Sequence, residues 1–116
     1  MIFSEDPLAA ALIGAGVELV GFEPAFPADR EPPRDALLRH RPGLVLIDCD
    51  HEEACSPTFF GPVLMTGARA VLVGSRRTRR AATALAEHFG LRAITLPADL
   101  ETIANLLRAE LEAAGR

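Results

Sequence analysis

The chain has 116 residues, of which 49% are hydrophobic and 24% are charged. This length and balance predict one folded domain over residues 1–116, and they exclude a disordered or collagen-like chain. The net charge is −4, which argues against direct nucleic-acid binding. All twelve basic residues are arginine, so mechanisms that need a lysine, such as Schiff-base chemistry or P-loop phosphate binding, are excluded.

The sequence shows no targeting or membrane signal. Acidic residues follow Met1 almost at once, and the longest apolar stretch, Leu8 to Val17, is too short to span a bilayer. The two cysteines, Cys49 and Cys55, are too few for a secreted disulfide framework, and their spacing with His51 fits no zinc site. We therefore expect a cytoplasmic protein with two ordinary thiols and no membrane contact.

Local signals divide the first part of the chain into elements. Asp6 and Pro7 are typical of a helix cap and a first helical residue, and Gly21 is a stop signal. Gly14 and Gly16 weaken this helix, which indicates close packing against a neighbour. The predicted elements are a strand at Met1–Glu5, a helix from Asp6 to Gly21, a weak edge strand at Phe22–Phe26, a loop at Pro27–Pro33 and a helix at Arg34–Arg41.

Two uninterrupted apolar runs mark the middle of the chain, and such runs are typical of parallel strands buried on both faces. The predicted elements here are a strand at Leu44–Ile47 ending in Asp48, a helix from Ser56-Pro57 that Gly61-Pro62 breaks or shortens, a strand at Ala70–Val73, a helix at Arg76–Phe89, a strand at Leu91–Leu96 and a last helix that Pro97 and Asp99 start. This alternation of five strands and five helices predicts an α/β fold with an open parallel sheet covered on both faces.

Polar residues stand at the carboxyl ends of these strands, where ligands bind in such sheets. They are Glu5 and Asp6, then Asp48 and Asp50, then Ser75. Two carboxylates about 4 Å apart repel by roughly 4 kcal/mol at an effective dielectric of about 20, so they need a cation or partial protonation. Oxygen ligands open to water suit Mg²⁺, and a metal, a carboxylate and a hydroxyl describe a site for phosphoryl transfer to Asp48. The alternative is that the acids only cap helices and end strands.

Several segments in this order resemble the receiver domain of two-component response regulators, over essentially the whole chain. They are Glu5-Asp6-Pro7-Leu8, the run from Arg41 to Asp48, the run from Ala70 to Ser75 and the segment that starts at Leu96-Pro97. The resemblance implies a flavodoxin-like three-layer fold with sheet order 2-1-3-4-5. It implies Asp48 as the phosphoacceptor, Ser75 as the phosphoryl-binding hydroxyl, and no enzymatic activity beyond phosphorylation and dephosphorylation of Asp48. It also implies Mg²⁺ held by Glu5, Asp6, Asp48 and the backbone carbonyl of Asp50.

The sequence departs from the receiver pattern at the switch positions. The lysine that the family has before the proline of the fifth strand is here Leu96, and the aromatic switch residue expected three positions earlier is Ala93. The acidic pair is also ambiguous, because one alignment assigns it to Ser4 and Glu5 and the other to Glu5 and Asp6. These changes point to a degenerate, pseudo-receiver type of domain, in which we expect slower phosphorylation or weaker coupling to output.

Arginines crowd the start of the predicted helix at Arg76–Phe89. Positive charge there is unfavourable by roughly 0.3–1 kcal/mol for each residue. One hypothesis is that Arg76 or Arg77 folds over the site and replaces the missing ammonium. A second hypothesis is a docking face for an acidic partner, and a third is a solvated arginine-rich turn.

Three classes of function stay open. In the first, a histidine kinase or a small phosphodonor phosphorylates Asp48 with Mg²⁺, and the face of the fourth helix, fifth strand and fifth helix changes its partners. The second is an interaction module of the same fold that acts without phosphorylation, which Leu96 and Ala93 favour. The third, a flavodoxin-like binding protein or enzyme, needs a phosphate loop after the first strand, where this chain has acids. The apolar Leu96 and Ala93 edge also suits a homodimer through the same face.

Overall fold

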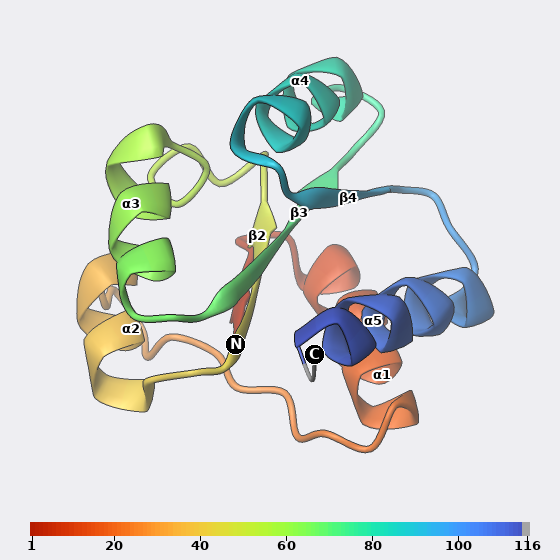
Figure 1. The fold of residues 1–116 in the computed structure, drawn as a ribbon, viewed down its shortest axis with the longest axis horizontal. Helices are drawn as coiled ribbons and strands as arrows, with labels where there is room; N and C mark the ends of the chain where they lie inside the picture. The colour runs from red at the N-terminus through yellow and green to blue at the C-terminus, as the bar shows by residue number, and fades with distance from the viewer. Residues whose placement is uncertain (115–116) are drawn as a thin grey trace.

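The computed structural model describes residues 1–114, which form an α/β fold around a parallel sheet (Figure 1). The elements in this range are β1 (Ile2–Phe3), α1 (Pro7–Leu19), α2 (Pro33–His40), β2 (Leu44–Asp48), α3 (Pro57–Met65), β3 (Arg69–Gly74), α4 (Arg79–Phe89), β4 (Arg92–Thr95) and α5 (Leu100–Ala114). The sheet has four strands in the order β1-β2-β3-β4, and each neighbouring pair is parallel. All carboxyl ends of the strands therefore lie at one edge of the sheet.

Two helical layers cover the sheet, with α1 and α5 on one face and α2, α3 and α4 on the other (Figure 1). Strand β2 contributes to both cores, because Val45 and Ile47 pack under α2, α3 and α4 whereas Leu46 packs under α1 and α5. All three side chains are almost fully buried. The apolar run therefore does form a strand buried on both faces, as the sequence predicts.

The predicted five-stranded order 2-1-3-4-5 is wrong in both strand count and order, because the segment Phe22–Phe26 is not a strand. The segment runs beside β1 as irregular chain and accepts a 2.9 Å hydrogen bond from the Ile2 N–H at the Ala25 carbonyl. Pro24 has no N–H to donate to a strand ladder. Phe22 and Phe26 are 56% and 43% exposed, so the segment buries little apolar surface that would fix it as a strand.

The predicted helices are present, with two differences in detail. The Asp6 carboxylate caps α1, as predicted, by accepting a hydrogen bond from the Leu8 N–H at 3.0 Å. The first difference is in α3, which is short but unbroken, with Pro62 inside it. Pro62 is the sixth of the nine residues of α3, so its missing N–H removes one hydrogen bond from the helix, which continues past it to Met65. Helix α4 begins at Arg79 rather than Arg76, because the preceding residues form the hydrogen-bonded turn described below.

A buried carboxylate joins α5 to the amino ends of two strands. Glu110 of α5 is 5% exposed and accepts hydrogen bonds from the Nε atoms of Arg69, at 2.9 Å, and Arg92, at 2.7 Å. These arginines begin β3 and β4, so the three residues clamp the sheet at the edge opposite the predicted site. The sequence gives no local signal for this clamp, since its members are far apart in the chain.

Replacement of Gly16 by alanine tests the contact between α1 and α5. An added Cβ at Gly16 would lie 2.6 Å from Ile103 Cγ2, whereas one at Gly14 would meet Phe26 at an ordinary 3.6 Å. We expect Gly16→Ala to lower the free energy of unfolding by about 1–3 kcal/mol. The matched control, Gly14→Ala, should raise it by about 0.5–1 kcal/mol through helix propensity. Equal effects of the two substitutions in denaturant titrations would contradict this packing.

Replacement of Glu110 by glutamine tests the clamp. The two arginine side chains are 40% and 47% exposed, so loss of the buried charge should cost less than for a fully buried pair, about 1–2 kcal/mol of unfolding free energy. The control is Glu112→Gln, an exposed residue on the same helix, which should change stability by less than about 0.5 kcal/mol. Urea titration measures both, and an unchanged Glu110→Gln midpoint argues against the clamp.

Candidate functional site

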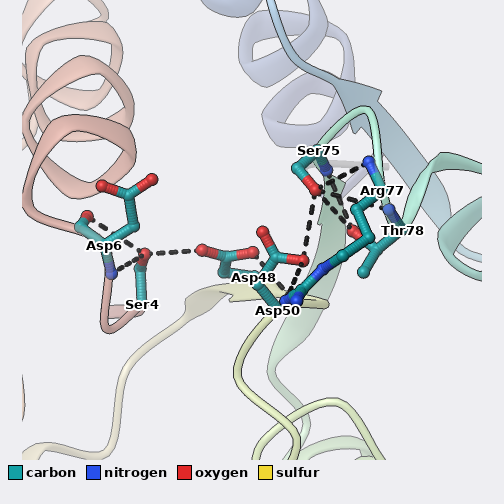
Figure 2. A network of polar contacts seen from close by, with 7 residues as sticks. All are labelled: Ser4, Asp6, Asp48, Asp50, Ser75, Arg77 and Thr78. Carbon is teal, nitrogen blue, oxygen red and sulfur yellow. Dashed lines mark hydrogen bonds and ion pairs between the residues drawn. The ribbon is translucent and has the colours of Figure 1, made fainter.

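The carboxylate of Asp48 lies at the carboxyl end of β2 and is 4% exposed. Its Oδ2 accepts a 2.7 Å hydrogen bond from the Ser4 hydroxyl, and its Oδ1 accepts a 2.9 Å bond from the Asp50 N–H (Figure 2). Both oxygens are thus held by donors of the protein itself. This satisfies a buried charge that would otherwise be costly.

Ser4 is the residue of the β1–α1 connection that contacts Asp48. Its Oγ also accepts from the Asp6 N–H at 3.2 Å, so the hydroxyl is fixed by a local turn while it donates to Asp48. Of the two alignments left open by the sequence, the structure thus brings the serine of the Ser4 and Glu5 pair to Asp48. The role of Ser4 as a donor was not predicted.

The predicted acids of the first strand point elsewhere. Asp6 caps α1, and its carboxylate is directed away from Asp48 (Figure 2). Glu5 is 75% exposed, and its Oε1 lies 3.3 Å from Nδ1 of His51. Within residues 1–114, no group of three or more His, Cys, Asp or Glu side chains is placed to share a metal ion. Asp6 and Glu5 are thus engaged by other groups, and the Mg²⁺ site stays a prediction.

Asp50 connects the end of β2 to the loop between β3 and α4. Its Oδ1 accepts a 3.1 Å hydrogen bond from the Ser75 hydroxyl and lies 3.3 Å from Nη2 of Arg77. Ser75 Oγ in turn accepts from the backbone N–H groups of Arg77 and Thr78, at 3.2 and 3.3 Å. The carboxylate of Asp50 therefore faces the hydroxyl for which the resemblance implies phosphoryl binding (Figure 2). It also faces the guanidinium of Arg77, one of the two arginines considered as a replacement cation (Figure 2).

Thr78 is a member of this network that the sequence analysis missed. Its Oγ1 accepts from the Ser75 N–H at 3.0 Å and lies 3.2 Å from the Ser75 hydroxyl. The two hydroxyl residues close a turn before the first residue of α4. The spacing Ser75-Arg-Arg-Thr78 was an available signal, because serine and threonine commonly form such side-chain turns before helices.

Leu96 and Ala93, which the resemblance places at switch positions, lie in different environments. Leu96 packs against the core under α1 and α5, whereas Ala93 packs against the core under α2, α3 and α4. Arg77 does reach an acid of the site, but that acid is Asp50, and the guanidinium is 79% exposed. Arg77 thus contacts Asp50 rather than Asp48, and the role of Arg76 or Arg77 as a replacement cation stays a hypothesis.

A cavity of about 360 Å³ lies over this network. Its lining combines three aspartates, a serine and an arginine with apolar side chains. The lining residues are Asp6, Leu8, Ala9, Leu12, Asp48, Asp50, Ser75, Arg76, Leu96 and Pro97. The structure therefore brings most of the predicted site residues to one cavity and leaves three outside its lining. Those in the lining are Asp6, Asp48, Asp50, Ser75, Arg76 and Leu96, and those outside it are Glu5, Arg77 and Ala93.

Searches of protein-family models, of curated proteins and of solved structures return no match to this chain. In the part of the chain that the structure describes, no helix combines the length and the apolar character needed to cross a membrane.

Substitution of Ser4 by alanine tests its bond to Asp48. Loss of this donor leaves a carboxylate oxygen buried without its partner, so we expect a loss of about 1–3 kcal/mol in the free energy of unfolding. Ser56→Ala is the control, because the Ser56 hydroxyl makes an exposed 3.4 Å contact and does not cap α3. Comparable losses in thermal and denaturant unfolding for both variants would show that Ser4 has no special role.

Proposed function

We propose that this chain is a receiver-like signalling domain of the pseudo-receiver type, which binds a partner protein without phosphorylation of Asp48. The observation that carries this proposal is that both carboxylate oxygens of Asp48, itself 4% exposed, are held by Ser4 and Asp50. The parallel α/β sheet, with Asp48, Asp50 and Ser75 around one cavity, supports the receiver-like assignment and its flavodoxin-like architecture.

The electrostatics of the site disfavour a phosphorylation switch. Transfer of a phosphoryl group to a carboxylate needs an accessible oxygen and positive charge near the developing negative charge. Here the oxygens of Asp48 are engaged, Leu96 supplies no charge, and the guanidinium of Arg77 is paired with Asp50. The hydroxyl of Ser75 donates to the same carboxylate of Asp50. A fixed carboxylate thus already holds the groups that would otherwise bind a phosphoryl group.

A phosphorylated receiver is the second candidate, and the cavity favours it. Asp48 and Ser75 both line a space of about 360 Å³, large enough for a small phosphodonor. In this function, a histidine kinase or small phosphodonor would phosphorylate Asp48 after Ser4 releases it. The two candidates thus differ in whether Asp48 reacts.

The arginines at the start of α4 suit an acidic partner. Arg76, Arg79 and Arg80 are exposed, and within residues 1–114 none of them is ion-paired to an acid of this chain. Uncompensated positive charge at a helix start is unfavourable in the isolated domain, so an acidic surface placed on it gains affinity. The exposed side of α4 is thus our proposed partner-binding surface.

Treatment with acetyl phosphate or beryllofluoride in Mg²⁺ distinguishes the two candidates. We expect the intact mass of the protein to stay unchanged with acetyl phosphate, and the amide NMR spectrum to stay unchanged with beryllofluoride, because Asp48 is not available. A receiver with a complete lysine and acidic pair, treated in parallel, shows that the reagents are active. A mass gain or shifts that disappear in Asp48→Asn would overturn the proposal in favour of the phosphorylated receiver.

Binding to a candidate kinase or other signalling protein tests the partner surface. Wild type and Asp48→Asn should bind with equal affinity, whereas Arg79→Glu with Arg80→Glu should bind roughly tenfold more weakly. Arg34→Glu with Arg41→Glu, which reverses two exposed arginines at the ends of α2, is the charge-matched control and should leave affinity nearly unchanged. Loss of affinity in Asp48→Asn alone would contradict phosphorylation-independent binding.

A further inference from the structure

A second cavity lies at the amino edge of the sheet, opposite the candidate functional site, and has a volume of about 410 Å³. Its lining is mostly apolar and includes Val17 and Val20 of α1, Leu46 of β2, and Leu107 and Leu111 of α5. It shares no residue with the cavity over Asp48. The cavity is therefore a separate candidate site on the face of the sheet that α1 and α5 cover.

The cavity is present because the segment after α1 does not form a strand. A strand at Phe22–Phe26 would pack alternate side chains against the helices that cover this face. Instead, the Ala25 carbonyl accepts one hydrogen bond from the Ile2 N–H, and Phe22 lines the cavity but is 56% exposed. The ring of Phe22 therefore does not fill the space between the end of α1 and the end of α5.

The interior of the cavity is apolar. Val17, Leu46 and Leu107 are each at most 6% exposed. The amino group of Met1 donates to the Leu44 carbonyl at 2.8 Å, and the Leu46 N–H donates to the Met1 carbonyl at 2.9 Å. Because these polar groups are paired with each other, they need no partner from a ligand. The interior thus suits an apolar chain rather than a polar molecule.

Three charged groups belong to lining residues: the side chains of Arg69 and Glu23 and the amino group of Met1. Burial lowers the pKa of the Met1 amino group to about 6, so this group adds little charge at neutral pH. Glu23 is exposed, so water and salt screen its carboxylate. Arg69 is half-buried and is therefore the main charge available to a ligand.

Arg69 has hydrogen-bonding capacity left for an anion. Its Nε donates to Glu110 at 2.9 Å, and within residues 1–114 its Nη atoms make no hydrogen bond. Arg92 donates to the same carboxylate at 2.7 Å, so two guanidinium groups share one negative charge. A carboxylate placed on the Nη atoms of Arg69 gains charge-assisted hydrogen bonds and balances the excess positive charge.

We propose that this cavity binds a small amphiphile with an apolar chain and a carboxylate head, of the class of a medium-chain fatty acid. The chain lies against Leu46 and Leu107, and the carboxylate accepts from the Nη atoms of Arg69. The cavity volume of about 410 Å³ falls in the range of small-molecule sites, about 300–1,000 Å³. The proposal does not rest on the proposed signalling function, because the cavity lies at the opposite edge of the sheet.

Titration of the full wild-type chain with decanoate and decylammonium tests the head group. Both ligands are kept below the concentration at which they form micelles, and binding is measured by calorimetry. We expect decanoate to bind roughly tenfold more tightly than decylammonium. Octanoate should bind more weakly than decanoate, by about threefold to fourfold for each methylene removed. Decanoate should shift the amide NMR signals of Leu46 and Leu107 and leave that of Asp50 unchanged.

Two matched arginine variants test the role of Arg69. Arg69→Gln and Arg92→Gln each remove one of the two arginine bonds to Glu110, but only Arg69 lines the cavity. Arg69→Gln should weaken decanoate binding roughly tenfold and change decanol binding by less than about twofold. Arg92→Gln should change the binding of either ligand by less than about threefold, because it leaves the donors at the cavity in place.

A variant that narrows the cavity tests the place of the apolar chain. Val20→Phe adds a ring at the lining, so it should weaken the binding of both decanoate and decanol at least roughly tenfold. Leu8→Phe is the control, since Leu8 is on the same helix, is 82% exposed and lies outside this cavity. It should leave both affinities unchanged.

Several results would overturn the proposal. They are the absence of decanoate binding, equal affinity for decanoate and decylammonium, decanoate-induced shifts centred on the exposed Leu8 or Met65, and an equal loss in the two arginine variants. Sedimentation of the protein with anionic vesicles, without binding of free decanoate, would assign the surface to a membrane and also overturn it. The wild-type titrations need no variant, so a failure of Arg69→Gln to fold does not affect them.

Discussion

The buried charge of Asp48 is the constraint on which the carboxyl edge of the sheet depends. A carboxylate that is 4% exposed must be hydrogen-bonded, and the two donors come from Ser4 and Asp50 on different segments of the chain. Because Asp50 is thereby placed next to β3, its own carboxylate reaches Ser75 and Arg77. One chain of contacts thus joins the β1–α1 connection, the loop after β2 and the start of α4. Loss of the hydrogen bond from Ser4 to Asp48 is therefore expected to affect all three segments, because their contacts depend on the Asp48 carboxylate.

Much of the fold is predictable because its signals are local. The apolar runs at Leu44–Ile47 and Ala70–Val73 form buried strands, and the cap at Asp6 starts α1 at the expected residue. The weak strand at Phe22–Phe26 was not formed, because strand pairing depends on backbone donors and on burial across the sheet. In the same way, the Glu110 clamp depends on three elements that meet only in the folded chain.

The candidate site is predictable in its location but less so in its contacts. The carboxyl ends of parallel strands meet at one edge, so Asp48, Asp50 and Ser75 were expected to lie together and do line one cavity. Which oxygen faces which donor depends on a turn at Ser4 and on the direction of the Arg77 side chain, and neither follows from residue spacing. In the same way, residue spacing places Glu5 and Asp6 near this edge but does not indicate that Asp6 caps α1 or that Glu5 lies beside His51.

A phosphorylation switch requires two states that differ in what the switch hydroxyl binds. In this chain Ser75 donates to the carboxylate of Asp50, which is part of the protein and carries its charge whether or not Asp48 reacts. A phosphoryl group on Asp48 would shift the loop before α4 only if it bound Ser75 more strongly than Asp50 does. The extent of the shift would be set by that difference in binding free energy. Leu96 adds no ammonium to that difference, and Arg77 already faces Asp50.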